Sequence, residues 1–224
     1  MMPKVLITPS ILSADLTRLQ EEVDSVATAD ALQIDVMDGH FVPNLTFGAP
    51  LIRKLKTKLP FDIHLMVSNP SDRIEEFVKV GAKHITFHAE AVQSPPEQRA
   101  LIAKIRARGC TAGIALNPDT PLSAINELLS SASSVSSVSS DSSKLDLVLC
   151  MTVIPGFAGQ EFRSDVLSKI ETLHKSHPTL PIQVDGGITR ETAKLCRAAG
   201  ATNLVAASAI FEEKDRTAAI EALR

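Results

Sequence analysis

The sequence predicts a single-domain α/β protein built as a TIM (β/α)8 barrel, and three observations support this prediction. The chain has 224 residues, a length that suits one domain or a small pair of domains. Short aliphatic, β-branched runs alternate strictly with longer amphipathic stretches, and we count eight such pairs. Eight βα units in a chain of this length match a compact barrel. A doubly wound open sheet is the alternative, although no GxGxxG follows the first predicted strand.

The predicted strands are short apolar runs, as a parallel sheet covered on both faces requires. In chain order they span residues 5–10, 31–38, 61–67, 84–90, 111–117, 145–153, 181–187 and 203–208. Hydrophobic residues make up 44% of the chain, yet it contains no Trp and no Tyr. The core must therefore be built mainly from aliphatic side chains.

The predicted helices between these strands have recognisable ends. Residues 69–72 (NPSD) have the form of a helix start, and Gly81 ends that helix. Residues 94–97 (SPPE) have the spacing of a capping box before a helix that ends at Gly109. A later helix runs from about 189 to 200. Apolar residues at spacings of three and four predict the first helix: Leu16, Leu19, Val23 and Val26.

A serine-rich segment at 130–143 interrupts the alternation within the single domain 1–224. Ten of its fourteen residues are serine, so it buries almost no apolar surface to offset the entropy lost on ordering. We predict a mobile, solvent-exposed insertion before the sixth strand. A phosphorylated regulatory loop is the functional alternative.

Composition excludes several classes of partner. The net charge is −3, which provides no basic surface for nucleic acid, and no stretch of about 18 apolar residues predicts a membrane span. The apolar run near the N-terminus is too short for a secretory signal and is interrupted by Pro9. Cys110, Cys150 and Cys196 are scattered and match no disulfide framework. We therefore expect a cytoplasmic protein with free thiols.

Charged residues inside two apolar strands are the first chemical signal. Asp35 and Asp185 lie in the runs LQIDVMD and PIQVDGG, and His64 lies in the third strand. Active sites of barrels form at the carboxyl ends of the strands. Because an unpaired buried carboxylate costs several kcal/mol, a divalent metal or a hydrogen-bonded network must compensate these residues. Carboxylates with imidazole suit zinc, manganese or iron, and His88 with Glu90 are expected to give hydrogen-bonded support.

Glycines late in the chain have the form of a phosphate site. They follow the sixth predicted strand and end the seventh, and Ser208 ends the eighth, a region where barrels commonly bind phosphate. Backbone amides at such turns can hold an anion. The candidate phosphate-binding residues are Gly156, Phe157, Ala158, Gly159, Gly186, Gly187, Ala207 and Ser208.

With these residues in view, the sequence resembles the ribulose-phosphate 3-epimerase family over nearly its whole length. The most specific segment is DVMDGHFVPN at 35–44. The other matching segments are PSILSAD (9–15), HLMV (64–67), HAEA (88–91), ALNP (115–118), MTV (151–153), PGF (155–157) and VDGGI (184–188).

The resemblance implies an enzyme of the pentose phosphate pathway that interconverts D-ribulose 5-phosphate and D-xylulose 5-phosphate. It implies that Asp35 and Asp185 exchange protons at C3 from opposite faces, through an enediolate and with one divalent cation (Zn, Mn, Fe, Co or Mg). It places Asp35, His64 and Asp185 at the metal. It also implies a homodimer or hexamer. The residues it assigns to substrate are Ser10, Met37, Met66, Met151, His64 and Asp185.

The sequence departs from the family pattern in four places. Gln33 stands where the family has a first metal-ligating histidine, and an amide oxygen is a poorer zinc ligand than imidazole. Ala158–Gly159 replaces a glycine pair and Ala207 replaces a glycine, so we expect altered phosphate binding. The serine tract of 130–143 is also foreign to the pattern.

Two other functions stay open at this point. One is an epimerase for a related ketose phosphate, such as allulose 6-phosphate. The other is a sugar-phosphate-binding barrel without catalysis, in which Gln33 has impaired the metal site.

Overall fold

A computed structural model of the chain describes residues 5–132 and 143–224. Most of the serine-rich segment 130–143 lies outside the described residues, so its predicted mobility is not tested. Within the described part, no helix is both long enough and apolar enough to cross a bilayer.

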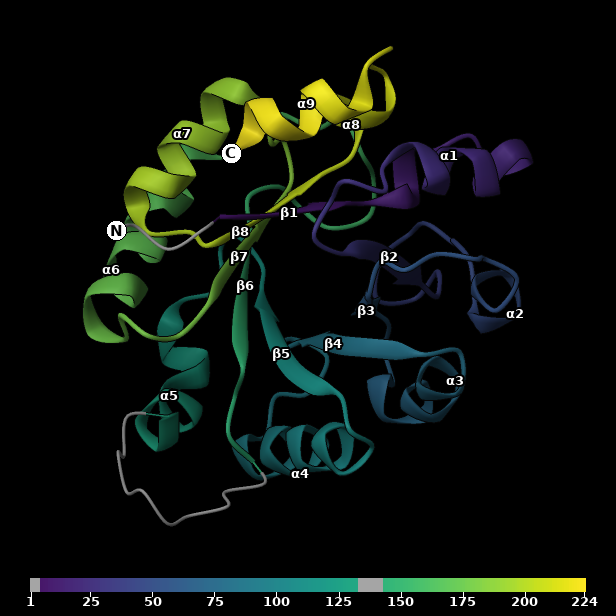
Figure 1. The fold of residues 1–224 in the computed structure, drawn as a ribbon. Helices are drawn as coiled ribbons and strands as arrows, with labels where there is room; N and C mark the ends of the chain where they lie inside the picture. Colours follow the sequence, from purple (N-terminus) through teal and green to yellow (C-terminus); the bar gives the residue numbers. More distant parts are fainter. Residues whose placement is uncertain (1–4, 133–142) are drawn as a thin grey trace.

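Eight strands form one parallel sheet whose order is β1-β8-β7-β6-β5-β4-β3-β2. The two strands at the ends of this order meet through a bridge between Ser10 and Gln33, which leaves a nearly closed barrel (Figure 1). The predicted barrel is thereby confirmed over the open sheet. The strands are β1 (Leu6–Pro9), β2 (Leu32–Met37), β3 (Phe61–Met66), β4 (Ala82–His88), β5 (Thr111–Leu116), β6 (Leu147–Met151), β7 (Ile182–Asp185) and β8 (Asn203–Ala206).

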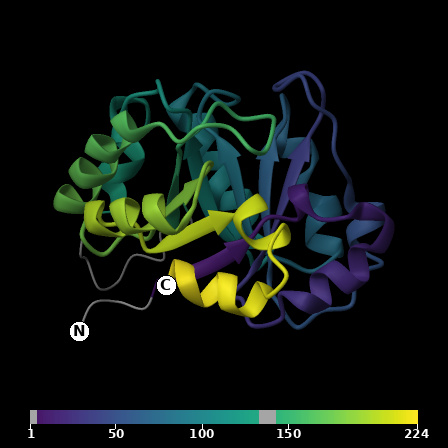
Figure 2. The same cartoon turned by 90° about the horizontal axis from the view of Figure 1, so that it is seen from above.

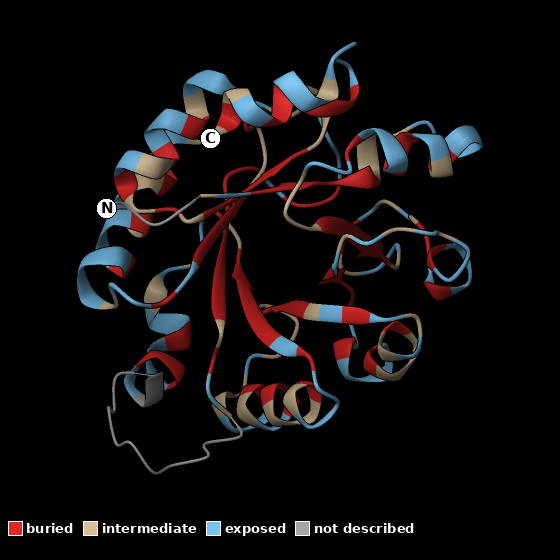
Figure 3. Ribbon diagram, in the orientation of Figure 1, coloured by how far each residue is buried: buried red, intermediate tan, exposed pale blue. Residues whose placement is uncertain are grey.

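The helices lie around the outside of the strands, as Figures 1 and 2 show. They bury one face against the sheet and expose the other (Figure 3), as amphipathic helices of a barrel do. The helices are α1 (Leu19–Ser25), α2 (Ala49–Ile52), α3 (Ile74–Lys79), α4 (Pro95–Ala107), α5 (Asn126–Ala132), α6 (Leu167–Ser176), α7 (Arg190–Ala199), α8 (Ser208–Phe211) and α9 (Arg216–Leu223).

The helix ends follow the sequence signals only in part. Residues 70–72 form a 3₁₀ turn without a capping hydrogen bond from Asn69, so α3 begins later, at Ile74. The first predicted helix likewise opens with a 3₁₀ turn at Leu16–Arg18 before α1. The Thr189 side chain caps α7 in a capping box, and Gly200 ends that helix in the left-handed conformation. Ser94 precedes α4, but its side chain makes no capping hydrogen bond. The predicted capping box at 94–97 is therefore wrong. The first two helical positions are prolines, which have no N–H to satisfy and already hold the helical φ angle.

Side chains alternate between two buried regions along each strand. In β2, the apolar Leu32, Ile34 and Val36 belong to the core between the sheet and the helices. The residues between them, Gln33 and Asp35, are equally buried but polar. Since successive side chains of a strand point to opposite faces, the polar set lies on the inside of the barrel.

Candidate active site

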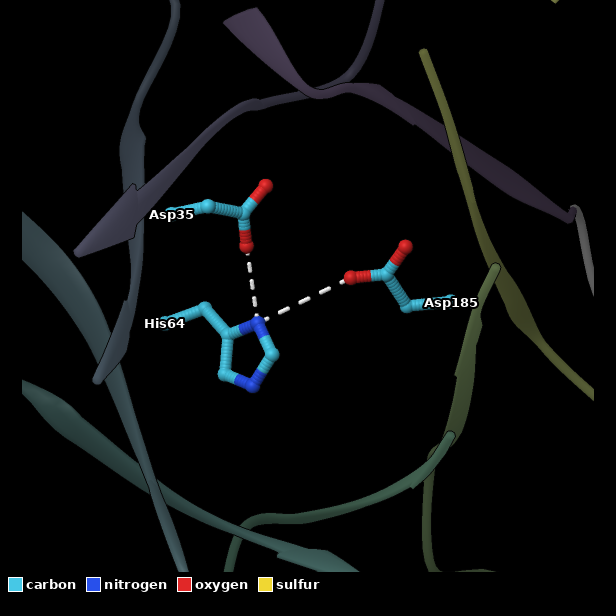
Figure 4. A group of neighbouring side chains, drawn as sticks. All are labelled: Asp35, His64 and Asp185. Atoms are coloured by element: carbon cyan, nitrogen blue, oxygen red, sulfur yellow. Dashed lines mark hydrogen bonds and ion pairs between the residues drawn. The ribbon is translucent and has the colours of Figure 1, made fainter. Parts of the chain in front are cut away.

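Two carboxylates and one imidazole meet inside the barrel. Asp35 lies on β2, His64 on β3 and Asp185 at the end of β7, and the three side chains point toward one another (Figure 4). The Nδ1 atom of His64 is 2.8 Å from Oδ1 of Asp35 and 3.6 Å from Oδ2 of Asp185. One ligand atom from each residue lies within 4.8 Å of the others. The structure thus brings together the three residues assigned to a metal from the sequence.

Gln33 joins this cluster through its amide group. Its Nε2 atom donates to Oδ1 of Asp35 at 2.9 Å and to Oδ2 of Asp185 at 2.7 Å. Its Oε1 atom is buried and has no hydrogen-bond partner. The amide carries Nε2 and Oε1 on the same carbon, so a half-turn about χ3 would exchange them and present Oε1 to the cluster. Carboxylate oxygens, an imidazole nitrogen and an amide oxygen together fit a divalent cation.

Burial and charge shift the pKa values of the cluster. Burial, reinforced by the negative charge of Asp35, raises the pKa of Asp185 to about 7. Burial by itself lowers the pKa of His64, but the hydrogen bond to Asp35 and the surrounding carboxylates outweigh it, so the pKa of His64 is raised. Without a cation, protons therefore compensate part of the negative charge here.

A second polar group lies behind His64. Nε2 of His64 is 2.9 Å from Nε2 of His88, and Nδ1 of His88 is 3.1 Å from Oε2 of Glu90. Burial lowers the pKa of His88 to about 4. Burial opposes ionisation of Glu90, yet hydrogen bonds from His88, Thr120 and the backbone of Asn117 lower its pKa to about 2. The support expected from His88 and Glu90 is present in the geometry.

A cavity of about 400 Å³ opens over the cluster and gathers the remaining predicted residues. The Ser10 hydroxyl lines it and donates to Oδ2 of Asp35. His64 and Gln33 do not line the cavity but lie fully buried beside Asp35. The predicted residues that line the cavity are Ser10, Asp35, Met37, Met66, Met151, Gly156, Phe157, Ala158, Gly159, Asp185, Gly186, Gly187, Ala207 and Ser208.

The backbone angle and the neighbouring side chains require glycine at position 186, directly after β7. Gly186 has φ = +116°, and a Cβ at this position would lie 2.4 Å from Cγ2 of Val153. No other residue fits this turn without displacing the side chain of Val153, which follows β6. Ala158 and Ala207 line the same cavity, and their effect on phosphate binding stays a prediction.

Two polar residues beside the cluster were missed from the sequence. Nε2 of Gln183 donates to Oδ2 of Asp62 at 2.7 Å, while Oε1 of Gln183 and Oδ1 of Asp62 are buried without partners. Asp62 and Gln183 each precede a cluster residue by two positions. The strand alternation that identified the cluster could have found them.

Comparison with known proteins identifies one family over nearly the whole chain. The model of the ribulose-phosphate 3-epimerase family matches residues 6–211. A rice protein named ribulose-phosphate 3-epimerase, cytoplasmic isoform, is 43% identical over 97% of this chain and 92% of its own length. A Bacillus subtilis protein named ribulose-phosphate 3-epimerase is 42% identical over 98% of both chains. A Treponema pallidum protein of the same name is 45% identical over 92% of this chain and 90% of its own length.

Solved structures add information on the fold alone. KGPDC from Streptococcus mutans superposes with a TM-score of 0.72 at 16% identity, covering 100% of this chain and 96% of that one. A tryptophan synthase α-subunit from Pyrococcus furiosus gives a TM-score of 0.67 at 13% identity, with 99% and 98% coverage. Since the family model and the curated relatives span nearly the whole chain, the protein belongs to the ribulose-phosphate 3-epimerase family.

Proposed function

We propose that this protein is an isomerase that interconverts D-ribulose 5-phosphate and D-xylulose 5-phosphate by inverting carbon 3. The observation that carries the proposal is the pair of carboxylates, Asp35 and Asp185, which reach toward each other from two sides of the barrel at one cavity (Figure 4). Inversion at carbon requires a base on one face of the substrate and an acid on the other. Two facing carboxylates supply both roles.

The two aspartates divide the proton transfer. One carboxylate removes the C3 proton, which is acidified by the neighbouring ketone, and the other delivers a proton to the opposite face; the roles exchange in the reverse direction. The raised pKa of Asp185 means that it can hold a proton near neutral pH. Ser10, which donates to Asp35, orients that carboxylate.

Methionines surround the position where the enediolate forms. Met37, Met66 and Met151 line the cavity and are nearly completely buried. Thioethers are polarisable and carry no acidic proton, so they exclude water without offering a competing proton donor. The turns after β6, β7 and β8, including Gly156, Gly186 and Ser208, would receive the phosphate at the far side of the cavity through backbone amides.

Asp35, His64 and Asp185 would hold a divalent cation, with the Gln33 amide oxygen as a further donor. Such a cation supplies Lewis-acid stabilisation of the oxygens that become negative when the C3 proton leaves. Because Gln33 contributes oxygen instead of imidazole nitrogen, we expect weaker zinc binding and a preference for manganese, magnesium or iron. Metal titration of the chelator-treated protein tests this expectation. Nanomolar zinc affinity with full zinc-supported activity would contradict it.

The test of the activity is hydrogen exchange at carbon 3. The protein is incubated with D-ribulose 5-phosphate in D₂O, with and without added divalent metals, and the sugars are analysed by NMR. Deuterium at C3 together with xylulose 5-phosphate supports the proposal. Absence of exchange with every metal leaves a sugar-phosphate-binding protein, and faster turnover of allulose 6-phosphate reassigns the substrate.

Two further properties stay predictions. We expect a homo-oligomer, a dimer or hexamer, which light scattering of the purified protein measures directly. We expect the protein in the cytoplasm, since the rice relative is named as a cytoplasmic isoform, and fractionation of the source cells tests this expectation.

A further inference from the structure

A continuous hydrogen-bonded chain runs from the loop after β5 to Asp35. Glu90 accepts hydrogen bonds at Oε1 from the backbone N–H of Asn117, at 2.8 Å, and from the Thr120 hydroxyl. Oε2 of Glu90 contacts Nδ1 of His88, and Nε2 of His88 contacts Nε2 of His64. Nδ1 of His64 in turn contacts Oδ1 of Asp35. The rings of His64 and His88 are both fully buried, so no bulk water competes with these contacts.

The direction of each hydrogen bond follows from the fixed end of this chain. A backbone N–H only donates, so Oε1 of Glu90 is held as an acceptor, and the carboxylate also accepts at Oε2. His88 therefore carries a proton on Nδ1, 3.1 Å from Oε2. Only one proton can lie between the two Nε2 atoms, which are 2.9 Å apart.

That proton belongs to His64. An imidazole with its proton on Nδ1 offers a lone pair on Nε2, so His88 accepts and His64 donates. The Nδ1 atom of His64 lies 2.8 Å from Asp35 and 3.6 Å from Asp185, so Nδ1 is the ring nitrogen that faces the carboxylates.

We infer that His88 and Glu90 are positioning residues that keep the proton of His64 on Nε2 and reserve its Nδ1 atom for the divalent cation. This inference rests on the proposed function in one respect: it takes Asp35, His64 and Asp185 to be the residues that bind the cation. A neutral His64 with its proton on Nδ1 would donate to Asp35 and leave no lone pair toward the carboxylates. Partners that fix the ring of a metal-ligating histidine typically change metal affinity about 10- to 100-fold when they are lost.

Glu90→Gln gives the most specific test because it inverts the chain. The new amide must still turn its oxygen to the N–H of Asn117, so its NH₂ group faces His88. The His88 proton then moves to Nε2, and the proton of His64 is driven to Nδ1. We expect Mn²⁺ affinity, measured by calorimetry on the metal-free protein, to fall about 10- to 100-fold.

The proton positions are read directly from ¹⁵N chemical shifts of the histidine rings in the metal-free protein. In the unmodified protein we expect His88 protonated on Nδ1 and bare on Nε2, with His64 protonated on Nε2. In Glu90→Gln the assignment of His88 reverses. A purely structural role for Glu90 would weaken folding without reversing these signals.

Two further variants complete the design. His88→Gln keeps an acceptor for His64 and a donor for Glu90, so it retains more Mn²⁺ affinity than His88→Leu. His84→Gln is the matched control, since His84 lies on the same strand but contacts Thr86 and Thr111 instead, and it leaves Mn²⁺ affinity unchanged.

The inference is overturned if His88 of the unmodified protein carries its proton on Nε2, a result that needs no variant to fold. It is also overturned if folded Glu90→Gln binds Mn²⁺ like the unmodified protein. The activity proposal fails separately: a protein that shows the expected ring protonation but never exchanges deuterium at C3 keeps the positioning role and loses the epimerase assignment.

Discussion

The inside of the barrel has two unlike walls. Along β5 and β6 it is apolar, and its buried residues form one cluster: Ala115, Leu147, Leu149, Met151 and Val153. Along β2, β3 and β4 it is polar, although its residues are just as buried: Gln33, Asp35, Asp62, His64, Thr86 and His88. One barrel therefore holds two kinds of core side by side.

The two walls contribute differently: the apolar wall stabilises the fold, and the polar wall provides the chemical groups of the site. Each apolar side chain on the β5–β6 wall stabilises the fold by leaving water, by about 1.5–3 kcal/mol for a leucine. The polar wall costs desolvation energy, which hydrogen bonds recover only where both partners are satisfied. Its unpartnered atoms, such as Oε1 of Gln33, lie at the centre of the proposed site. We expect changes to the polar wall to affect function. Changes to the apolar wall should affect folding, except at Met151 and Val153, which also line the cavity.

The largest expected effect is that of Asp185→Asn. Removing one of the two proton-transferring groups should lower the epimerisation rate by about 10²- to 10⁴-fold. Stability should not fall. Because the pKa of Asp185 is raised to about 7 in the fold, ionisation costs the metal-free protein stability as pH rises through that value. Thermal unfolding at pH 8 should give an equal or higher Tm. A large drop in Tm would show that Asp185, which contacts the polar wall from β7 through Gln33, is needed for folding as well as for function.

Leu149→Ala makes the opposite change on the apolar wall. Leu149 is completely buried, and truncation of such a residue costs about 2–5 kcal/mol. Urea unfolding should show this loss, while the turnover of the folded protein stays within about threefold. Leu195→Ala, at a residue that is 48% exposed, should change stability by less than about 0.5 kcal/mol. If the turnover of folded Leu149→Ala fell by much more than about threefold, the apolar wall would also act in function, and the distinction between the walls would be lost.

Gln33→His tests whether one residue sets the metal preference. Imidazole suits zinc better than an amide does, so we expect zinc affinity to rise at least about tenfold, or about 1.4 kcal/mol. Chelator competition on the metal-free protein measures it. Gln33→Ala is the comparison, because it removes the bridge between Asp35 and Asp185 without adding a ligand. Unchanged zinc affinity in Gln33→His would mean that Gln33 does not face the cation.

Periodicity and strand ends made most of the fold and the centre of the site predictable. The convergence of Asp35, His64 and Asp185 follows once parallel strands close, since their carboxyl ends meet at one face. The contacts of the Gln33 amide were harder to predict. Gln33 and Asp185 are 152 residues apart in sequence, and they meet only because the barrel closes. The capping box at 94–97 failed because the local signal ignored what Pro95 and Pro96 already supply.

Asp62 was not predicted for a different reason. It lies near the start of β3, and functional residues were expected only at the carboxyl ends of the strands. Its negative charge nevertheless raises the pKa of both His64 and Asp185. Asp62→Asn should lower both pKa values, so that protons leave the cluster more easily and Mn²⁺ binding begins at lower pH. Burial and the nearer charged groups act more strongly than Asp62 on both His64 and Asp185, so we expect a displacement of less than about one pH unit.

Calorimetry with Mn²⁺ between pH 5.5 and 8.5 measures this smallest of the expected effects. Because the amide oxygen introduced at position 62 can still accept from Nε2 of Gln183, the hydrogen bond now made at 2.7 Å is kept and only the charge is lost. Asp24→Asn, which removes the same charge from the exposed surface, should leave the profile in place. A shift toward higher pH in Asp62→Asn would show that the polar wall does not act on the aspartates through its charge.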